Sequence, residues 1–378
     1  MSTTCMERCQ LLRGETADRH WAKLTCGGAE EIAVTLPTRP GETPAHLFQR
    51  LYDWLASEPH WRVLRQDVFG VLGTDAASGR ARAYRLDGSD WPVTWVEQGN
   101  GHGSPVAGIQ VHGIRGVAMT PVQHRGRSVG MVYEDEWARH CVLGGLRPAD
   151  ARKNREEQAA EVLDTMERVL HQVDMSFTDV YRTWFYLDDI LDWYDEFNAV
   201  RNGFFKTRGV FDRLVPASTG IGGSNAAGTA VVADLMAVQP KSPGFKLRPV
   251  PSPLQCPALE YGSSFSRAVE IVVPGQRRLL VSGTASIEPG GATAHVGDVR
   301  AQIKTTMEVV RAILTSCGLD WEDSVRAIAY FKHTEDMPAF DQYCRNQGLP
   351  ALPVIVTKND VCRDDLLFEL EVDAIKVD

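Results

Sequence analysis

The sequence predicts an α+β protein that contains two tandem copies of one structural unit. Residues 179–186 (DVYRTWFY) and 323–330 (DSVRAIAY) share an aspartate, an arginine and a tyrosine at a constant offset of 144 residues. The closing strands 233–238 (ADLMAV) and 370–375 (LEVDAI) align as well. A duplicated unit commonly has a site between its copies. Positions at which the copies differ indicate where one copy has gained a chemical role.

Each copy is predicted to be a β-β-α-β-α-β unit with a mixed sheet and two helices on one face. The elements expected in the first copy are a strand at 137–143, helices at 155–173 and 190–207, and strands at 179–187 and 229–238. Those expected in the second are strands at 266–273, 277–284, 323–332, 353–358 and 366–376, and helices at 299–316 and 335–347. The glycine-rich segment 216–223 is interpreted as a turn that presents backbone donors.

The chain is expected to divide into three stretches. Residues 1–84 would form an N-terminal extension: a tail to about residue 43, a helix and short strands. The helix starts at Thr43-Pro44, where threonine suits the N-cap and proline the first helical position. Residues 85–250 would form the first unit and 251–378 the second. Six prolines between residues 240 and 257 indicate a linker.

Composition narrows the class of function. The net charge of −9 over 378 residues argues against a general binder of nucleic acid or of anionic membranes. No apolar run approaches the roughly 20 residues that span a bilayer, and the N-terminus has no signal-peptide core, so a cytoplasmic protein is expected. A small anionic substrate stays possible, because a local pair of arginines outweighs a distant negative surface.

The cysteines predict no metal centre. The eight cysteines contain no C-x-x-C pair. Cys5, Cys9 and Cys26 lack a fourth ligand at a suitable spacing, so they are interpreted as reduced thiols in a tail rather than as a zinc site.

The C-terminal segment 362–371 (CRDDLLFELE) contains the candidate acids. Strand alternation puts Glu369 and Glu371 on one face. Two interpretations are open: a half-buried strand whose acids face water, or acids with a chemical role. The comparison of the copies favours the second, because Glu369 aligns with Val232 and Glu371 with Asp234.

Two further candidate binding features lie near the ends of predicted strands: Arg267 and the small residues of 281–286. Arg267, in the segment 261–268 (YGSSFSRA), is either a surface arginine on an edge strand or a bidentate clamp for a carboxylate. The small residues of 281–286 (VSGTAS) would let backbone N–H groups approach a ligand closely.

With these residues the repeat resembles the RidA/YjgF unit, and two such units after an N-terminal addition resemble the chorismatases. The resemblance covers roughly residues 85–378. The matching stretches are WAR (137–139), RTW (182–184), PASTGIG (216–222), YG (261–262), SRA (266–268), SGTA (282–285), HVGDVRAQ (295–302) and CRDDLLFELE (362–371). The last is the most specific. Plain RidA proteins carry an arginine where this chain has Leu352, which argues against imine deaminase activity.

The resemblance implies a fold and a chemistry. RidA proteins form trimers with sites between subunits, so the two units are expected to pack as two neighbours of a trimer, a pseudo-trimer fragment. Chorismatases release pyruvate from chorismate without a cofactor. Glu369 would be the general acid that protonates the enolpyruvyl methylene, and Glu371 the supporting acid that raises its pKa. The chain itself would be a monomer or a homo-oligomer.

The resemblance also implies binding residues and a product. Those expected to bind substrate are Arg267, Arg139, Arg363, Tyr261, Gly283, Thr284, Ala285, Thr219 and Gly220. Gly283 and Cys362 resemble the branch that forms 3-hydroxybenzoate rather than the hydrolysing branch. The alternatives are a dihydroxycyclohexadiene carboxylate, a mixture of 3- and 4-hydroxybenzoate, or a non-catalytic RidA-like protein that binds a small carboxylate.

Overall fold

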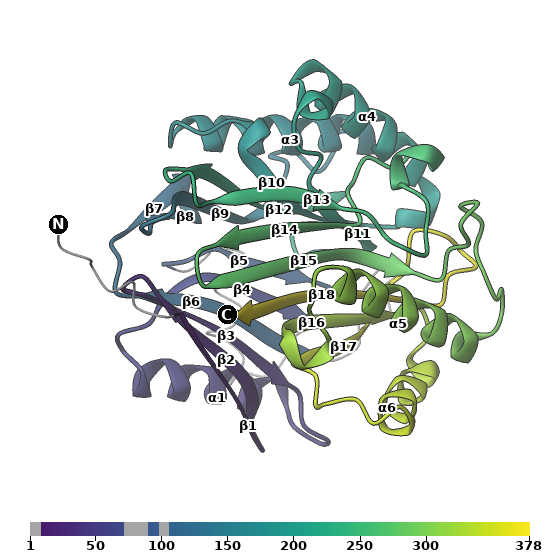
Figure 1. Cartoon of the computed structure of the whole chain (residues 1–378). Helices are drawn as coiled ribbons and strands as arrows, with labels where there is room; N and C mark the ends of the chain where they lie inside the picture. The colour runs from purple at the N-terminus through teal and green to yellow at the C-terminus, as the bar shows by residue number, and fades with distance from the viewer. Residues whose placement is uncertain (1–8, 72–89, 98–105) are drawn as a thin grey trace.

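The computed structural model describes residues 9–71, 90–97 and 106–378, so Cys5 lies outside the described residues. Its strands form three six-stranded sheets (Figure 1). The first contains β1 (Gln10–Thr16), β2 (Arg19–Cys26), β3 (Ala29–Pro37), β4 (Arg62–Phe69), β5 (Val93–Val96) and β6 (Gly108–Arg115). The second contains β7 (Met119–His124), β8 (Arg127–Glu134), β9 (Ala138–Leu146), β10 (Val180–Leu187), β11 (Ala217–Gly222) and β12 (Val231–Pro240). The third contains β13 (Lys246–Val250), β14 (Ala268–Val273), β15 (Gln276–Ala285), β16 (Ser324–Phe331), β17 (Val354–Lys358) and β18 (Phe368–Val377).

Helices cover the outer face of each sheet (Figure 1). They are α1 (Pro44–Ser57), α3 (Arg155–His171), α4 (Tyr194–Thr207), α5 (Val299–Ser316) and α6 (Met337–Asn346). The N-cap predicted for the first helix is confirmed, because the Thr43 side chain accepts a hydrogen bond from the backbone N–H of His46. The predicted helix 190–207 is interrupted near its start, where a short 3₁₀ turn at Ile190–Asp192 precedes α4.

All three sheets have the same strand order. In each, three antiparallel strands come first, the sixth strand pairs with the third, and the fourth lies between the sixth and a parallel fifth. We call the three parts the N-terminal unit (10–115), the middle unit (119–240) and the C-terminal unit (246–377). The α+β class and the tandem pair are therefore confirmed, and the expected extension is a third unit of the same topology.

The expected boundaries need correction for the same reason. The division near residue 85 falls inside the N-terminal unit, because β5 and β6 pair back onto β4 and β3. The expected tail forms β1–β3, and the proline-rich linker contains β13, which pairs with β14. The segment 216–223 is not a turn: residues 217–222 of it form β11, whose backbone pairs in parallel with β10.

The units pack around a pseudo-threefold axis. Each has its own core between sheet and helices, and the inner faces of the sheets share a central apolar cluster. Phe69, Tyr186 and Tyr330 occupy the same register position in the three units, opposite Gly108, Val232 and Glu369. The Phe69 ring makes edge contacts with both tyrosine rings, at 6.4 and 6.3 Å between centroids. The three inner faces thus meet at one line.

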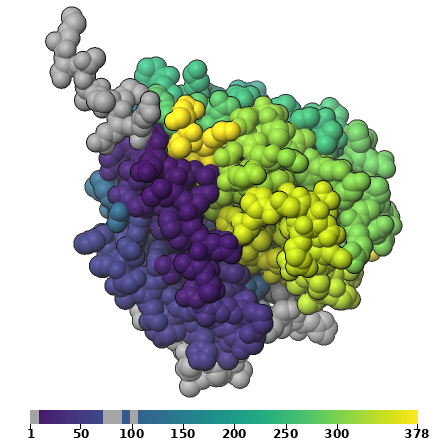
Figure 2. All heavy atoms as spheres, turned by 60° about the horizontal axis from the view of Figure 1, so that its bottom comes forward, coloured from purple at the N-terminus to yellow at the C-terminus, as the bar shows by residue number. Residues whose placement is uncertain are grey.

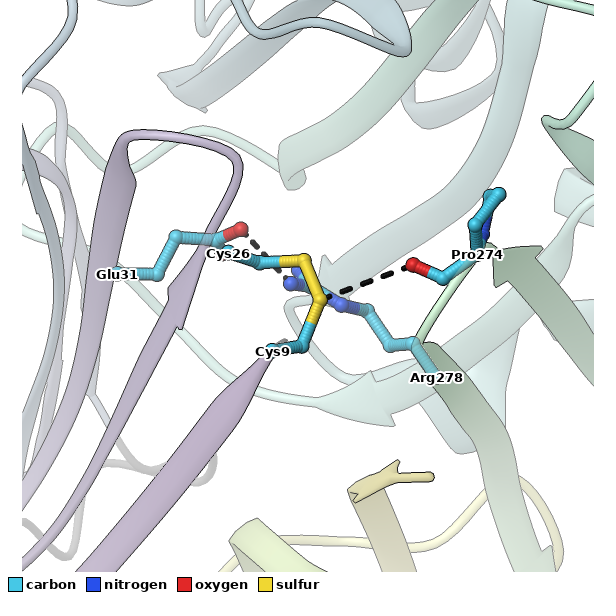
Figure 3. The surroundings of a disulfide bond; sticks show 5 residues. All are labelled: Cys9, Cys26, Glu31, Pro274 and Arg278. Atoms are coloured by element: carbon cyan, nitrogen blue, oxygen red, sulfur yellow. Dashed lines mark hydrogen bonds and ion pairs between the residues drawn. A yellow bond between two sulfur atoms is a disulfide. The ribbon is translucent and has the colours of Figure 1, made fainter. Parts of the chain in front are cut away.

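The first strands pack against the end of the chain, as the adjoining purple and yellow surfaces of Figure 2 show. Ala22 and Leu24 of β2 form an apolar cluster with Val325 and Ile375 of the C-terminal unit. Arg278 of β15 reaches across and pairs with Glu31 of β3 at 2.8 Å (Figure 3). The N-terminal unit is therefore part of the same packed body as the site-bearing strands.

The expectation of reduced thiols is wrong for two of the three N-terminal cysteines. Cys9 and Cys26 form a disulfide (Figure 3). The physical reason is the β1–β2 hairpin. In it Gln10 pairs with Thr25, so the adjoining residues Cys9 and Cys26 lie side by side. Within the described ranges, each helix is too short or too polar to cross a bilayer.

Candidate active site

The two glutamates of β18 are buried, not solvent-facing. Glu369 is 5% exposed and Glu371 is fully enclosed. They lie opposite Tyr330 and Ile328 of β16, and their side chains face the middle unit across the unit boundary. The interpretation of a plain half-buried strand is therefore wrong, because its polar face is covered by β10 and β11.

Glu371 is the centre of a buried ion network. It accepts hydrogen bonds from Arg182 at 3.0 Å and Thr219 at 2.5 Å, and it pairs with Arg326 at 2.8 Å. The indole N–H of Trp184 donates to it as well, at 3.1 Å. Burial by itself would raise the pKa of Glu371, but the two guanidinium groups and the Thr219 hydroxyl lower it below its ordinary value. Glu371 is thus a permanent anion.

Glu369, two residues earlier on the same face, has the opposite electrostatics. Burial, followed by the negative charge of Glu371, raises the pKa of Glu369 to about 8, although Arg182 and Arg267 oppose the shift. The charge of Glu371 is expected to raise the pKa of Glu369, and its effect has that direction. A carboxyl group that keeps its proton near neutral pH can act as a general acid.

Glu369 lines a cavity between the middle and C-terminal units. Several expected binding residues line it too: Gly220, Tyr261, Arg267, Gly283, Ala285, Cys362 and Arg363. A methyl group on Gly283 would overlap Oε1 of Glu369, so glycine at this position makes room for the acid. Burial raises the pKa of the Cys362 thiol to about 12, so this cysteine is a neutral wall of the cavity.

Arg267 is not the surface arginine of the alternative interpretation. It is 4% exposed, and its Nε and Nη2 atoms both donate to the carbonyl oxygen of Cys256, at 3.1 and 2.8 Å. The Tyr261 ring lies 5.3 Å from its guanidinium carbon. These contacts hold one edge of the guanidinium group and leave its charge at the cavity wall.

Three expected residues lie elsewhere. Thr219 is behind the cavity, where its hydroxyl bonds Glu371 and accepts from the backbone N–H of Gly283 at 3.1 Å. Thr284 points away, because strand alternation separates it from Gly283, and its hydroxyl donates to the Ser282 carbonyl. Arg139 does not line the cavity; it donates to the carbonyl oxygen of Val173 and lies 3.6 Å from Glu134.

Sequence reasoning missed the wall that α4 provides. Tyr194 and Arg201 of this helix line the cavity. Arg201 is 1% exposed, its Nη2 donates to Asn198 at 2.6 Å, and its Nε has no hydrogen-bond partner among the described residues. The available signal was an arginine within the apolar stripe of a helix, between Phe197 and Phe204.

The boundary between the N-terminal and middle units repeats part of this arrangement. Asp234 occupies the register position of Glu371, and it accepts a hydrogen bond from Thr94 at 2.7 Å and pairs with Arg65 at 3.1 Å. Val232 stands in the place of Glu369. The second boundary therefore has the network without a counterpart of Glu369.

No metal centre accompanies either arrangement in the part of the chain that the structure describes. No group of three or more His, Cys, Asp or Glu side chains is placed there to hold an ion.

Comparison with known proteins agrees with these features. The family described as endoribonuclease L-PSP matches residues 143–231. A 3-hydroxybenzoate synthase of Streptomyces hygroscopicus is 29% identical over 65% of this chain and 76% of its own length. A chorismatase of Streptomyces rapamycinicus is 28% identical over 52% of this chain and 64% of its own length.

Another chorismatase of Streptomyces hygroscopicus is 24% identical over 76% of this chain and 90% of its own length. Among solved structures, a chorismatase crystal structure superposes with a TM-score of 0.62 at 18% identity, over 82% of this chain and 92% of that one. These matches confirm the resemblance: the chain is a relative of the chorismatases, with their fold and with a RidA-type L-PSP segment in its middle unit.

Proposed function

We propose that this protein is a chorismatase, an enzyme that converts chorismate to 3-hydroxybenzoate and pyruvate. The observation that carries the proposal is Glu369, a buried carboxyl group with a pKa of about 8 in a cavity between two units. The curated relatives described above support the same substrate.

The cavity suits a small dianion. Arg201, Arg267 and Arg363 line it. Glu369, which lies in the same cavity, holds its proton at neutral pH and so adds no negative charge there. The local field is therefore positive in a chain whose net charge is −9, and a desolvated arginine binds a carboxylate strongly.

The reaction begins with a proton transfer to carbon. Glu369 protonates the methylene carbon of the enolpyruvyl ether, which makes that group an oxocarbenium-like leaving group. The 4-hydroxyl of the ring then displaces the ether oxygen at C3, pyruvate leaves, and the arene-oxide-like product rearranges to 3-hydroxybenzoate. The proton that the hydroxyl group loses balances the one that Glu369 gives, so no water is consumed.

Glu371 keeps this acid ready. It lies on the same strand face, is ionised, and is fixed by Arg182, Arg326 and Thr219, so its negative charge next to Glu369 is permanent. A fixed charge that disfavours ionisation of its neighbour needs no rearrangement during the reaction.

Product choice depends on the room around the ring. Gly283 and Cys362 both line the cavity, and the position of Glu369 requires that residue 283 has no side chain. With these two residues, internal displacement by the 4-hydroxyl is proposed to be faster than attack by water.

Incubation of the purified protein with chorismate, followed by chromatography and a pyruvate assay, tests the proposal. We expect 3-hydroxybenzoate and pyruvate in equal amounts. A dihydroxycyclohexadiene acid with pyruvate would place the chain in the hydrolysing branch. Binding of chorismate without turnover would instead favour the non-catalytic binding protein.

A further inference from the structure

A second pocket lies where the pseudo-symmetry places the counterpart of the active site. Leu143 pairs with Gly130 as Val281 pairs with Ala268, so residues 127, 129, 145 and 147 correspond to 265, 267, 283 and 285. The backbone N–H of Gly145 donates to Thr94 at 2.9 Å, as that of Gly283 donates to Thr219. The two pockets therefore occupy equivalent positions at successive unit boundaries.

The lining of this second pocket is strongly basic. The pocket has a volume of about 250 Å³, and four of its nine described lining residues are His124, Arg125, Arg127 and Arg147. The acid next to it, Glu161, is shared among three donors: Lys153 at 2.8 Å, the backbone N–H of Ala149 at 2.8 Å and Arg125 at 3.5 Å. In a chain of net charge −9, this gathering of basic side chains around one hollow favours an anion there.

One group in this pocket has its hydrogen-bonding capacity unused. The Nε2 atom of His124 is buried and has no hydrogen-bond partner among the described residues. A buried ring nitrogen without a partner is costly, and an oxygen of a bound anion would satisfy it.

The position of the proton donor is apolar here. Val232 replaces Glu369 at this boundary and is 5% exposed within the central apolar cluster. Among the described residues, a ligand held by the arginines would therefore meet no counterpart of Glu369.

We propose that this pocket, between β7, β8 and the end of β9, binds a small dianion, a dicarboxylate or a phosphate, without converting it. The arginines supply charge and planar donors, and His124 supplies one further donor when it is protonated. Arginine binds both carboxylates and phosphates. The titrations with chorismate and with phosphate therefore decide which of the two the pocket prefers.

The protonation of His124 gives a readout that is independent of turnover. Burial lowers the pKa of His124, and the positive charges of Arg125, Arg168 and Arg127 lower it further. A bound anion opposes those charges, so the pKa of His124 is expected to rise when the pocket fills.

Calorimetric titration tests the proposal. The chain with Glu369→Gln and Arg267→Ala, which weakens the active site and stops turnover, is titrated separately with chorismate and with inorganic phosphate. We expect one of the probes to bind, and Arg125→Gln with Arg147→Gln to weaken its binding about tenfold or more. The matched control, Arg152→Gln with Arg213→Gln, removes the same charge from exposed sites and is expected to change the affinity less than about twofold.

Phosphate binding with no chorismate binding assigns the pocket to phosphate-bearing ligands, and the reverse result assigns it to dicarboxylates. The single change Arg125→Gln and an NMR titration of His124 in the unmodified chain cover the case in which the double variant misfolds. Absence of binding by both probes, equal loss in the pocket and control variants, or a His124 pKa that the probe found to bind leaves unchanged would overturn the proposal.

Discussion

The two boundaries of the middle unit contain the same polar network, yet one of them has an acid that the other lacks. On one side Arg182, Thr219 and Glu371 meet, and on the other Arg65, Thr94 and Asp234. The arginines follow a register shift at the same place in β10 and β4. The network is thus part of how the units pack, and the proposed chemistry is an addition to it at the position of Glu369.

The third boundary, between the C-terminal and N-terminal units, lacks most of this network. Arg326 is present, but Ile355 replaces the threonine and Gln110 replaces the acid, donating to the Ala327 carbonyl at 2.9 Å. Gly108 stands where Glu369 would be, and any side chain there would overlap Ile355. Packing therefore tolerates loss of the network at one boundary, so the network by itself does not mark a site.

The largest expected effect comes from removal of the proton at the one position that distinguishes the boundaries. Glu369→Gln keeps the shape of the side chain but has no transferable proton, so kcat should fall by ~10²–10⁴-fold, the usual value of general acid catalysis. Chorismate binding, measured by calorimetry, should persist. A variant that keeps more than about a tenth of the wild-type kcat would show that Glu369 is not the acid.

The two network acids allow a direct comparison of stability. Glu371→Gln leaves the buried Arg182 without its anion and removes the nearest carboxylate of Arg326, which keeps Asp373 at 3.5 Å, so we expect the free energy of unfolding to fall by roughly 3–5 kcal/mol. Asp234→Asn should cost less, because burial raises the pKa of Asp234 to about 6 even with Arg65 beside it. Urea unfolding of both variants measures the difference; an equal loss would contradict the assigned charge states.

Arg267→Ala should raise KM for chorismate by about tenfold or more, because a desolvated cation that binds a carboxylate is lost. Arg139→Ala is the matched control: it removes the same side chain from a residue outside the cavity, and its KM should stay near the wild-type value. Steady-state kinetics on both variants decide the point. A near-normal KM for Arg267→Ala would remove this arginine from substrate binding.

A smaller effect concerns the product. In Gly283→Ala the new methyl group overlaps Oε1 of Glu369 and forces the acid to move, so turnover should fall. Together with Cys362→Ala, which enlarges the cavity at a second lining residue, the change should raise the share of the hydrolysis product seen by chromatography. If the product ratio is unchanged at full turnover, branch choice is set by other residues.

Much of the C-terminal half could be predicted from the sequence, because strong apolar periodicity and the repeat specify its elements. Glu369 was found through its contrast with Val232, a comparison that needs no coordinates. The N-terminal unit was missed because Arg65 and Phe69 match the other copies only when the strand register is known. Arg201 was missed, and Arg139 wrongly included, because residues distant in sequence meet only across the packed boundary.

The central claim is that Glu369 is protonated in the working enzyme, and the pH dependence of kcat/KM tests it most directly, since that ratio reports the ionisation of the free enzyme. The carboxyl group is active as the acid, so kcat/KM should be level near neutral pH and fall as pH rises through about 8. A kcat/KM that stays constant or increases through this range would contradict the account.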